Sequence, residues 1–554
     1  MKLDPVTLEV LRNRLVTIAY EMGTVLRRTG YSPNIRERED CSCVLADPAG
    51  QIIAQAEHIP GHLGMLAVAM PALLERIPPD AWGPGDVVIF NDPYVGGSHL
   101  PDIRLVVPII VEDRLLGFAA NLAHHADVGG MAPGSMPSTA TEIFQEGVFI
   151  PFVRLYRRGV QNEDLLRLFL QNVRTPEERE GDLRAQLAAA QLGERRIREV
   201  VDKVGVEAWF AYAAEILNSS ERLMRAKIAR LLPPGEYRAE MQIDDDGVDP
   251  RPILIRASVT VDGDEIRVDF TGSDPQRESA VNCIWGFTVS ATYFVVKGVV
   301  DPAIPANSGC YRPITVEAPL GSVVRVRPPG ACAAGNETWQ RIAEVLIAAF
   351  AKADPRLVKA PSHGCMNNVV FGGMDPRKGR LYTYYETIGG GEGGRASLDG
   401  MDGVHVLGTN TLNTPVEVIE SSFPLRVEAY ELIPDSGGAG AFRGGLGIKR
   451  VYRVLDHQAT LVVNSDWIRW KPEGLLGGKR GAFTRFVLDE GTDRERVPST
   501  CKFIARLDAG STLSVYTGGG NGYGPPRERD PEAILADLRD EKISPEAARA
   551  HYYN

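Results

Sequence analysis

The feature that most constrains the fold is a long helical block that separates two strand-rich stretches of the chain. Between Glu163 and Leu232 the sequence is rich in Ala, Leu, Arg and Glu at helical spacing and contains few glycines. The run LLPPG at 231–235 stops this block, and the alternation typical of strands follows it. We expect an α+β protein of several domains with mixed sheets and packed helices, whose metal-bearing N-terminal half is built from short strands and helices.

The length of the chain predicts more than one domain. A chain of 554 residues is too long for one ordinary hydrophobic core. We expect an N-terminal metal-binding α+β domain over residues 1–160, a helical segment over 161–235, a β-rich domain with glycine-rich loops over 236–520, and a C-terminal helical tail over 521–554.

Capping and turn signals place some elements more closely. Asp4 as an N-cap and Gly30 as a terminator predict a helix between them, because the intervening apolar residues recur every three or four positions. The turn at 47–50 predicts a pair of short strands. In the β-rich domain we expect only one good helix, from Trp339 to Ala351.

Charge and cysteine content exclude several classes of protein. The chain has 61 basic and 72 acidic residues and a net charge of −11, so nucleic acid and anionic lipid are not expected as partners. No apolar run is long enough to span a bilayer, and MKLDPVTLEV lacks the apolar core of a secretory signal. Seven cysteines without a CxxC pair indicate reduced thiols, so we expect a cytoplasmic protein.

The histidines are concentrated in one short part of the sequence. Five of the nine are His58, His62, His99, His124 and His125. In NDPYVGGSHLPD, His99 and Asp102 are three residues apart in a turn, where both side chains can reach one ion. His124 ends an apolar strand that an antiparallel neighbour could carry back to that turn, and Asp40 precedes another strand.

Two histidines with nearby carboxylates suit Zn, Mn or Fe(II) and leave a position open for water or substrate. The spacing alone fits a metal site and ordinary structural histidines about equally well. Adjacent strand residues point to opposite faces, so His125 is not expected to bind the same ion as His124. We predict instead that His125 and Asp127 form a catalytic acid–base pair near the metal. Glu337 is interpreted as a charge favoured by a helix N-terminus.

Several long motifs resemble one known family. NDPYVGGSHLPDIRLVVPI is similar to the signature of the hydantoinase B/oxoprolinase family, which includes the acetone carboxylase alpha subunits. The resemblance continues in TGSDPQRESAVNC, DPAIPANSGCYRPITV and GVHVLGTNTLNTPVEV and spans nearly the whole chain. Members of this family are subunits of ATP-dependent enzymes that open cyclic amides such as hydantoins and 5-oxoproline, or that carboxylate ketones.

The resemblance implies a metal-bearing subunit that works with a partner. In such enzymes a hydantoinase A-type subunit binds ATP and phosphorylates the substrate carbonyl oxygen, and the B-type subunit carries one divalent metal. The family's His-x-x-Asp and downstream His fall on His99, Asp102 and His124, and its additional acidic position falls on Asp40. A heterotetramer or a larger heteromer is implied.

The chain lacks the phosphate-binding loop GxxxxGK[ST], which agrees with ATP being bound by the partner subunit. The nearest match, at 474–480, is one residue short and ends in Arg. The glycine-rich run at 389–394 lacks a strand-to-helix context, so it is expected to form ordinary turns or to line the substrate cavity.

We therefore expect a subunit of an ATP-dependent cyclic amidohydrolase that acts on a hydantoin, on 5-oxoproline or on another lactam. One alternative is the alpha-type subunit of an ATP-dependent ketone carboxylase of the acetone or acetophenone type. A second alternative, from another class, is a non-catalytic scaffold for the ATP-binding partner.

Overall fold

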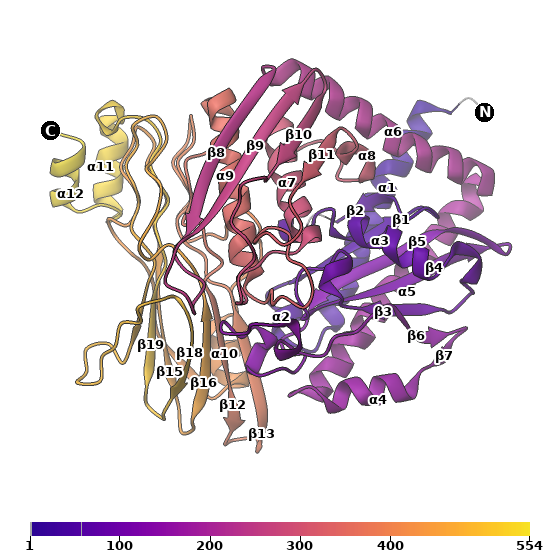
Figure 1. Cartoon of the computed structure of the whole chain (residues 1–554), viewed down its shortest axis with the longest axis horizontal. Coiled ribbons are helices and arrows are strands. Elements are labelled where there is room, and N and C mark those ends of the chain that lie inside the picture. Colours follow the sequence, from indigo (N-terminus) through magenta and orange to yellow (C-terminus); the bar gives the residue numbers. More distant parts are fainter. Residues whose placement is uncertain (1–2, 57, 554) are drawn as a thin grey trace.

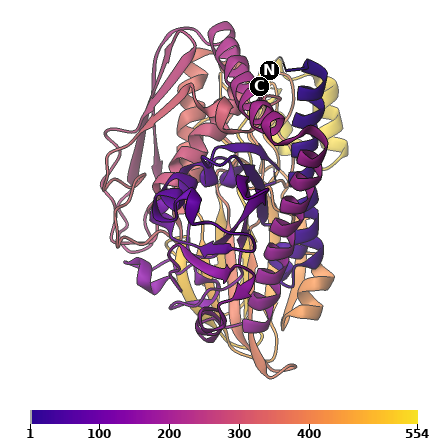
Figure 2. The same ribbon diagram turned by 90° about the vertical axis from the view of Figure 1, so that its right-hand side faces the viewer.

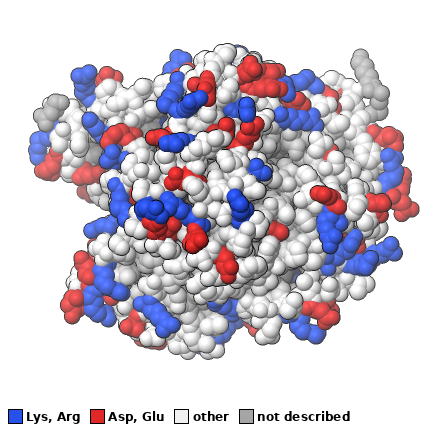
Figure 3. Space-filling model, viewed as in Figure 1, with Lys and Arg blue, Asp and Glu red and all other residues white. Residues whose placement is uncertain are grey.

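The computed structural model describes residues 3–56 and 58–553, which form four sheets with helices packed between and around them (Figure 1). The expected α+β class with mixed sheets is confirmed. No helix within the described ranges combines the length and apolarity that crossing a membrane requires. On the face drawn in Figure 3, acidic and basic side chains are intermingled, and no extended basic area is seen.

The N-terminal sheet has seven strands in the order β2-β1-β5-β4-β3-β6-β7, and all neighbours are antiparallel. Its strands are β1 (Cys41–Ala46), β2 (Ile52–Gln55), β3 (Val87–Phe90), β4 (Asp102–Val111), β5 (Arg114–His124), β6 (Val153–Arg157) and β7 (Val160–Gln161). The central strands are buried on both faces, which explains why their sequences are largely apolar.

Helices cover both faces of this sheet. On one face, α1 (Pro5–Thr29) and α5 (Pro176–Val204) run side by side, as Figure 2 shows, and pack on Cys43 and Ala119. On the other face, α3 (Met65–Arg76) packs on Val44 and Phe118. The remaining helices of this half are α2 (Pro33–Arg36), α4 (Glu163–Gln171) and α6 (Val206–Leu231). The predicted helical block thus shares a core with the N-terminal sheet.

The middle of the chain forms a four-stranded sheet in the order β11-β10-β9-β8. Its strands are β8 (Gly235–Ile243), β9 (Ile253–Asp262), β10 (Glu265–Asp269) and β11 (Ile314–Glu317). The helix α9 (Gly335–Ala353) packs on β8 and β9 and also contacts α7 (Trp285–Val300), so it joins this sheet to the centre of the molecule (Figure 1).

Two four-stranded sheets in the C-terminal half, β13-β12-β16-β18 and β14-β15-β19-β17, enclose a common core. Their strands are β12 (Asn368–Asp375), β13 (Arg380–Glu386), β14 (Leu425–Leu432), β15 (Ile448–Val454), β16 (Ala459–Asn464), β17 (Arg485–Leu488), β18 (Lys502–Leu507) and β19 (Thr512–Tyr516). The tail forms α11 (Pro531–Arg539) and α12 (Pro545–His551), as its sequence predicts.

The expectation of one good helix in the β-rich stretch is wrong. Besides α9, this stretch contains α7, α8 (Ser308–Tyr311) and α10 (Val416–Ser422). Twelve of the 16 residues of α7 are buried, so the helix is apolar on nearly all sides and shows no amphipathic stripe. Its valines and aromatic residues are also typical of strands, which hides the helix in the sequence.

The glycine-rich runs pack backbone against backbone. The Gly391 amide donates to the Gly518 carbonyl at 3.0 Å, and the Gly445 amide donates to the Glu392 carbonyl at 2.7 Å. A Cβ atom on Gly391 would lie 1.9 Å from the Gly445 carbonyl oxygen and 2.2 Å from the Gly520 nitrogen. These glycines are required because no side chain fits between the loops.

We expect Gly391→Ala to destabilise the protein by more than about 3 kcal/mol, because the new methyl group would overlap fixed backbone atoms. The measurement is the soluble yield and the unfolding temperature. Gly298→Ala in α7 is the control, because a Cβ atom there meets nothing within 4 Å and alanine favours helix. Equal behaviour of the two variants would contradict this account of the loops.

Candidate metal centre

The antiparallel pairing of β4 with β5 places an acidic residue opposite a histidine. Asp102 is the first residue of β4 and His124 the last residue of β5, and the two are partners in the register. The loop before β4 carries His99, whose carbonyl oxygen accepts a hydrogen bond from the Asp102 amide at 3.2 Å. These three residues therefore meet at one end of the hairpin, as the sequence predicts.

Three atoms of the kind that bind metals converge there. His99 Nε2 lies 2.9 Å from His124 Nδ1 and 3.3 Å from Asp102 Oδ1, and His124 Nδ1 lies 3.1 Å from the same oxygen. Metal bonds of 2.0–2.2 Å at tetrahedral angles would separate such atoms by about 3.4 Å. All three side chains are buried, and His99 Nδ1 and His124 Nε2 lack partners among the described residues. The group could therefore hold a divalent cation.

The Asp102 carboxylate is prepared to act as a charged ligand. Burial opposes its ionisation, but the charge of His99 and the hydrogen bonds from both imidazoles outweigh burial, so the pKa of Asp102 lies well below its usual value. The hydroxyl of Ser98 donates to its other oxygen. The carboxylate is therefore ionised and its orientation is fixed.

His124 is held by residues from two distant parts of the chain. The side-chain amide of Asn34 donates to the His124 carbonyl oxygen at 2.7 Å. The ring of Tyr385, at the end of β13, stacks on the imidazole with the ring centroids 4.6 Å apart. The guanidinium of Arg38 lies over Tyr385, 4.7 Å from its ring centroid, and donates to Thr387 Oγ1 at 2.6 Å. The N-terminal sheet and the C-terminal sheets thus meet at this centre.

The three residues line a cavity of about 40 Å³, which has room for a few water-sized groups. Its other lining residues are Asp40, Ile59, Gly61, His62, Phe287, Asn336, Met366, Tyr385, Thr387, Gly408, Thr409 and Thr411. Ser42 Oγ lies 3.0 Å from His62 Nδ1. Burial lowers the pKa of His62, so its imidazole is neutral at pH 7. None of the glycines at 389–394 is among the residues that line this cavity.

The structure separates the other predicted site residues. Asp40 lines the cavity, and its carbonyl oxygen accepts the His124 amide at 3.0 Å, although its carboxylate does not belong to the converging trio. His125 points to the opposite face, where Nε2 lies 2.9 Å from Gln186 Oε1. Asp127 accepts a hydrogen bond from Arg174 at 2.9 Å. Neither His125 nor Asp127 lines the cavity, and their role in proton transfer stays a prediction.

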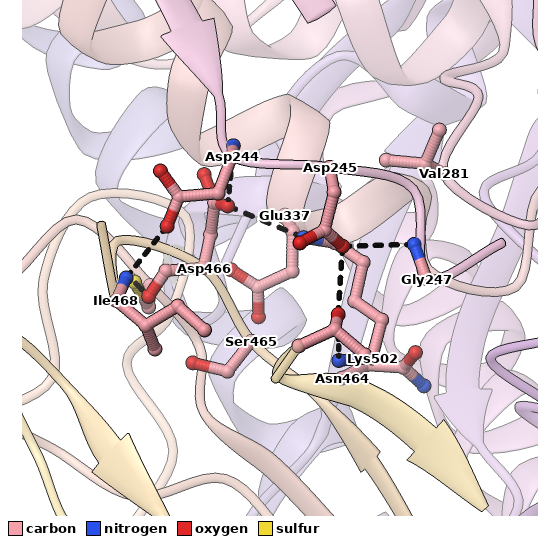
Figure 4. Close-up of polar contacts among 12 residues, drawn as sticks. Asp244, Asp245, Gly247, Val281, Glu337, Asn464, Ser465, Asp466, Ile468 and Lys502 are labelled. Carbon is pink, nitrogen blue, oxygen red and sulfur yellow. Dashed lines mark hydrogen bonds and ion pairs between the residues drawn. The ribbon is translucent and has the colours of Figure 1, made fainter. Parts of the chain in front are cut away.

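A buried cluster of charges lies deeper in the molecule, at the start of α9 (Figure 4). Asp466 accepts hydrogen bonds from Lys502 at 3.2 Å and from Arg341 at 2.7 Å. Asp244 accepts hydrogen bonds from backbone amides of the 468–470 segment. Burial raises the pKa of Glu337 to about 8 and that of Asp244 to about 6. Burial thus disfavours ionisation of these two acidic groups.

Glu337 connects this cluster to the cavity. Its Oε1 accepts hydrogen bonds from the Met366 amide at 3.0 Å and from Asn368 Nδ2 at 3.3 Å. Asn368 Oδ1 accepts the hydroxyl of Tyr385 at 2.7 Å. The interpretation of Glu337 as a helix-terminus charge therefore misses its partners, which lie 29 or more residues away in sequence. No local pattern around Glu337 or Tyr385 signals these contacts.

The chain is similar to proteins of one family. The hydantoinase B/oxoprolinase family model matches residues 4–526. An uncharacterized protein of Methanocaldococcus jannaschii is 41% identical, over 99% of this chain and 96% of its own length. The crystal structure of the ATP-dependent caprolactamase from Pseudomonas jessenii matches with a TM-score of 0.93 and 30% identity, over 100% of this chain and 96% of that chain. A nucleotide-free acetone carboxylase structure shares the fold with a TM-score of 0.88 and 20% identity, over 99% and 79%.

We expect Glu337→Gln to gain stability relative to the wild type as the pH rises from about 5.5 to about 8. The folded state holds a proton on Glu337 that the unfolded chain releases near its ordinary pKa of 4.5, so the wild type loses stability across this window. The amide cannot lose that proton. The difference should grow by up to about 1.4 kcal/mol per pH unit and is measured by denaturant unfolding at several pH values.

Glu417→Gln serves as the control for this experiment, because Glu417 is an exposed residue in the first turn of α10. Its stability should follow that of the wild type at every pH. If Glu337→Gln and the wild type change in parallel, Glu337 is ionised in the folded protein and the expectation is wrong.

Proposed function

The chain belongs to the hydantoinase B/oxoprolinase family, and from this premise we propose that it is the metal-bearing subunit of an ATP-dependent cyclic amide hydrolase. The observation that carries the proposal is the convergence of His99, Asp102 and His124 on one buried point beside a cavity. Substrates of this class are hydantoins, 5-oxoproline and other lactams.

In this proposal His99, Asp102 and His124 hold one divalent Zn, Mn or Fe ion, and Asp40 supplies a fourth ligand from the cavity wall. When bound, such an ion supplies Lewis acidity that lowers the pKa of a water molecule or polarises a carbonyl group. Tyr385 and Asn34 keep His124 in place, and Ser98 keeps the Asp102 carboxylate in place.

His62 is a proton acceptor in the proposed reaction. It lines the cavity, lies outside the proposed ligand set and is neutral at pH 7 because burial lowers its pKa. A neutral imidazole can take a proton from a water molecule that attacks the amide carbon. In the tautomer in which Nδ1–H donates to Ser42 Oγ, Nε2 is free to accept that proton.

An amide carbonyl is a poor electrophile, so ring opening requires activation by ATP. We assign ATP binding and carbonyl phosphorylation to a hydantoinase A-type partner, because this sequence contains no phosphate-binding loop of the GxxxxGK[ST] type. A reactive phosphorylated substrate must pass between the two subunits without meeting bulk water. We therefore propose a stable heteromer, a heterotetramer or larger, with an interface above about 2,000 Å².

The shared fold with acetone carboxylase keeps a ketone carboxylase subunit as the second candidate. At 20% identity that similarity concerns the fold alone, whereas the caprolactamase is 30% identical over the whole chain. The hydrolase is for this reason the leading proposal.

We expect the purified chain to bind about one divalent ion, and His99→Ala and Asp102→Ala to lose it without unfolding. Plasma mass spectrometry after reconstitution with Zn, Mn or Fe measures the metal content, and circular dichroism checks the fold. His551→Ala, in the exposed last turn of α12, is the control and should keep its metal. Full metal content in His99→Ala would contradict the proposal that His99 binds the metal.

With the partner subunit, we expect the wild type to open a lactam or hydantoin only in the presence of ATP. The metal-free variants should assemble with the partner but lose at least about 100-fold in turnover, because activation of the attacking water is lost. Turnover is measured as the ring-opened amino acid. Retention of carbon-14 from bicarbonate in the product would favour the carboxylase, and unchanged turnover in the variants would favour a scaffold.

A further inference from the structure

Asn336, the second residue of α9, presents an unused acceptor to the cavity. Its side chain lines the cavity and is 2% exposed. Its Oδ1 has no hydrogen-bond partner among the described residues, and Nδ2 reaches only the Met366 sulfur, at 3.4 Å. A buried carbonyl oxygen without a donor is unfavourable because it has lost its hydrogen bonds to water, so a donor from a ligand would restore that free energy.

The other polar groups of the cavity wall are already occupied. The hydroxyls of Thr387 and Thr411 lie 2.9 Å apart, and both accept from Arg38. Thr409 accepts from Gln340 at 3.2 Å, and the Tyr385 hydroxyl donates to Asn368. The proposed metal ligands and His62 aside, Asn336 is thus the polar side chain of the described cavity wall whose oxygen has no hydrogen-bond donor.

We propose that Asn336 determines specificity by accepting a hydrogen bond from the N–H group of the scissile amide, so that the enzyme selects cyclic secondary amides and rejects N-alkylated ones. This inference rests on the proposed function. A cyclic secondary amide presents one oxygen and one N–H side by side. Phosphorylation of the oxygen leaves that N–H in place as an O-phosphorylated iminium, whose proton Asn336 holds until water attacks the carbon. The oxygen and carbonyl carbon face the metal ligands, and the N–H faces Asn336 across the same small cavity. A tertiary amide places a methyl group against Asn336 and leaves its oxygen unpaired.

The space for the rest of the ring lies next to this cavity. Ile59 lines both the metal cavity and a second cavity of about 200 Å³. The second cavity is lined mainly by apolar groups, which include Pro60, Leu63 and Phe294. Displacement of the Ile59 side chain would join the two spaces. The amide end of the ring would then lie in the polar cavity, and the ring methylenes would lie against Leu63 and Phe294.

The test uses the metal-loaded heteromer with δ-valerolactam and with its N-methyl derivative, 1-methyl-2-piperidone. Dissociation constants are measured by calorimetry without ATP, and kcat and KM are measured with ATP. The wild type should prefer δ-valerolactam by at least about 10-fold in binding, because the site is built to pair the N–H group. Asn336→Leu should lose that preference, because it should bind δ-valerolactam more weakly while its affinity for the N-methyl compound stays unchanged. Asn336→Asp keeps an acceptor oxygen and should retain the preference.

Asn464→Leu is the matched control, because Asn464 is buried and has an unpartnered Oδ1, but neither lines the cavity nor binds a residue that does. Its preference for the secondary amide should equal that of the wild type. Metal content and unfolding temperature of each variant separate a local effect from misfolding.

Two failures are distinguishable. If the wild type opens δ-valerolactam and Asn336→Leu keeps the full preference for the N–H compound, the inference is wrong and the proposed function stands. If the wild-type heteromer with metal and ATP opens no lactam, hydantoin or 5-oxoproline, the proposed function falls, and the inference falls with it.

Discussion

The pairing of β4 with β5 is the interaction on which the candidate metal centre depends. Side chains alternate between the faces of a sheet, so a slip of one residue would turn either Asp102 or His124 away from the cavity. Alternate residues of these strands are buried under α1 and α5 on one face and under α3 on the other. Any slip would exchange these two cores, and hydrophobic packing therefore fixes the geometry of the site.

The centre is closed by contacts between segments that are far apart in the chain. Arg38 and His124 enclose the Tyr385 ring, and the buried charges of Figure 4 join the start of α9 to β18 and to the loops after β8 and β16. That cluster combines four carboxyl groups, those of Asp244, Asp245, Asp466 and Glu337, with the buried cations Lys502 and Arg341 and with Arg469, whose side chain is partly exposed. One retained proton balances the charge. Buried ion pairs of this kind add little to the free energy of unfolding, but they disfavour other arrangements of the chain that would leave a charge unpaired.

The sequence predicts what short-range physics determines. The ends of α1 follow from Asp4 and Gly30, and the convergence of His99, Asp102 and His124 follows from a turn and one antiparallel pair. Tyr385, Glu337 and Asn336 are not predicted, because their roles arise from contacts with residues far away in the chain. The helix α7 is hidden for a related reason, since burial on all sides removes the periodicity that marks a helix.

The size of the cavity bears on how the proposed reaction is divided. About 40 Å³ admits the reacting atoms of a small ring but not the ring together with a nucleotide. This agrees with the proposal that phosphorylation takes place on the partner subunit and that the activated substrate then enters this cavity. Exclusion of bulk water protects an activated amide from uncontrolled hydrolysis and strengthens each electrostatic contact inside the site. In such a site the few polar atoms that remain unpaired determine which substrate is selected, because an unsuitable substrate leaves them buried without a hydrogen-bond partner.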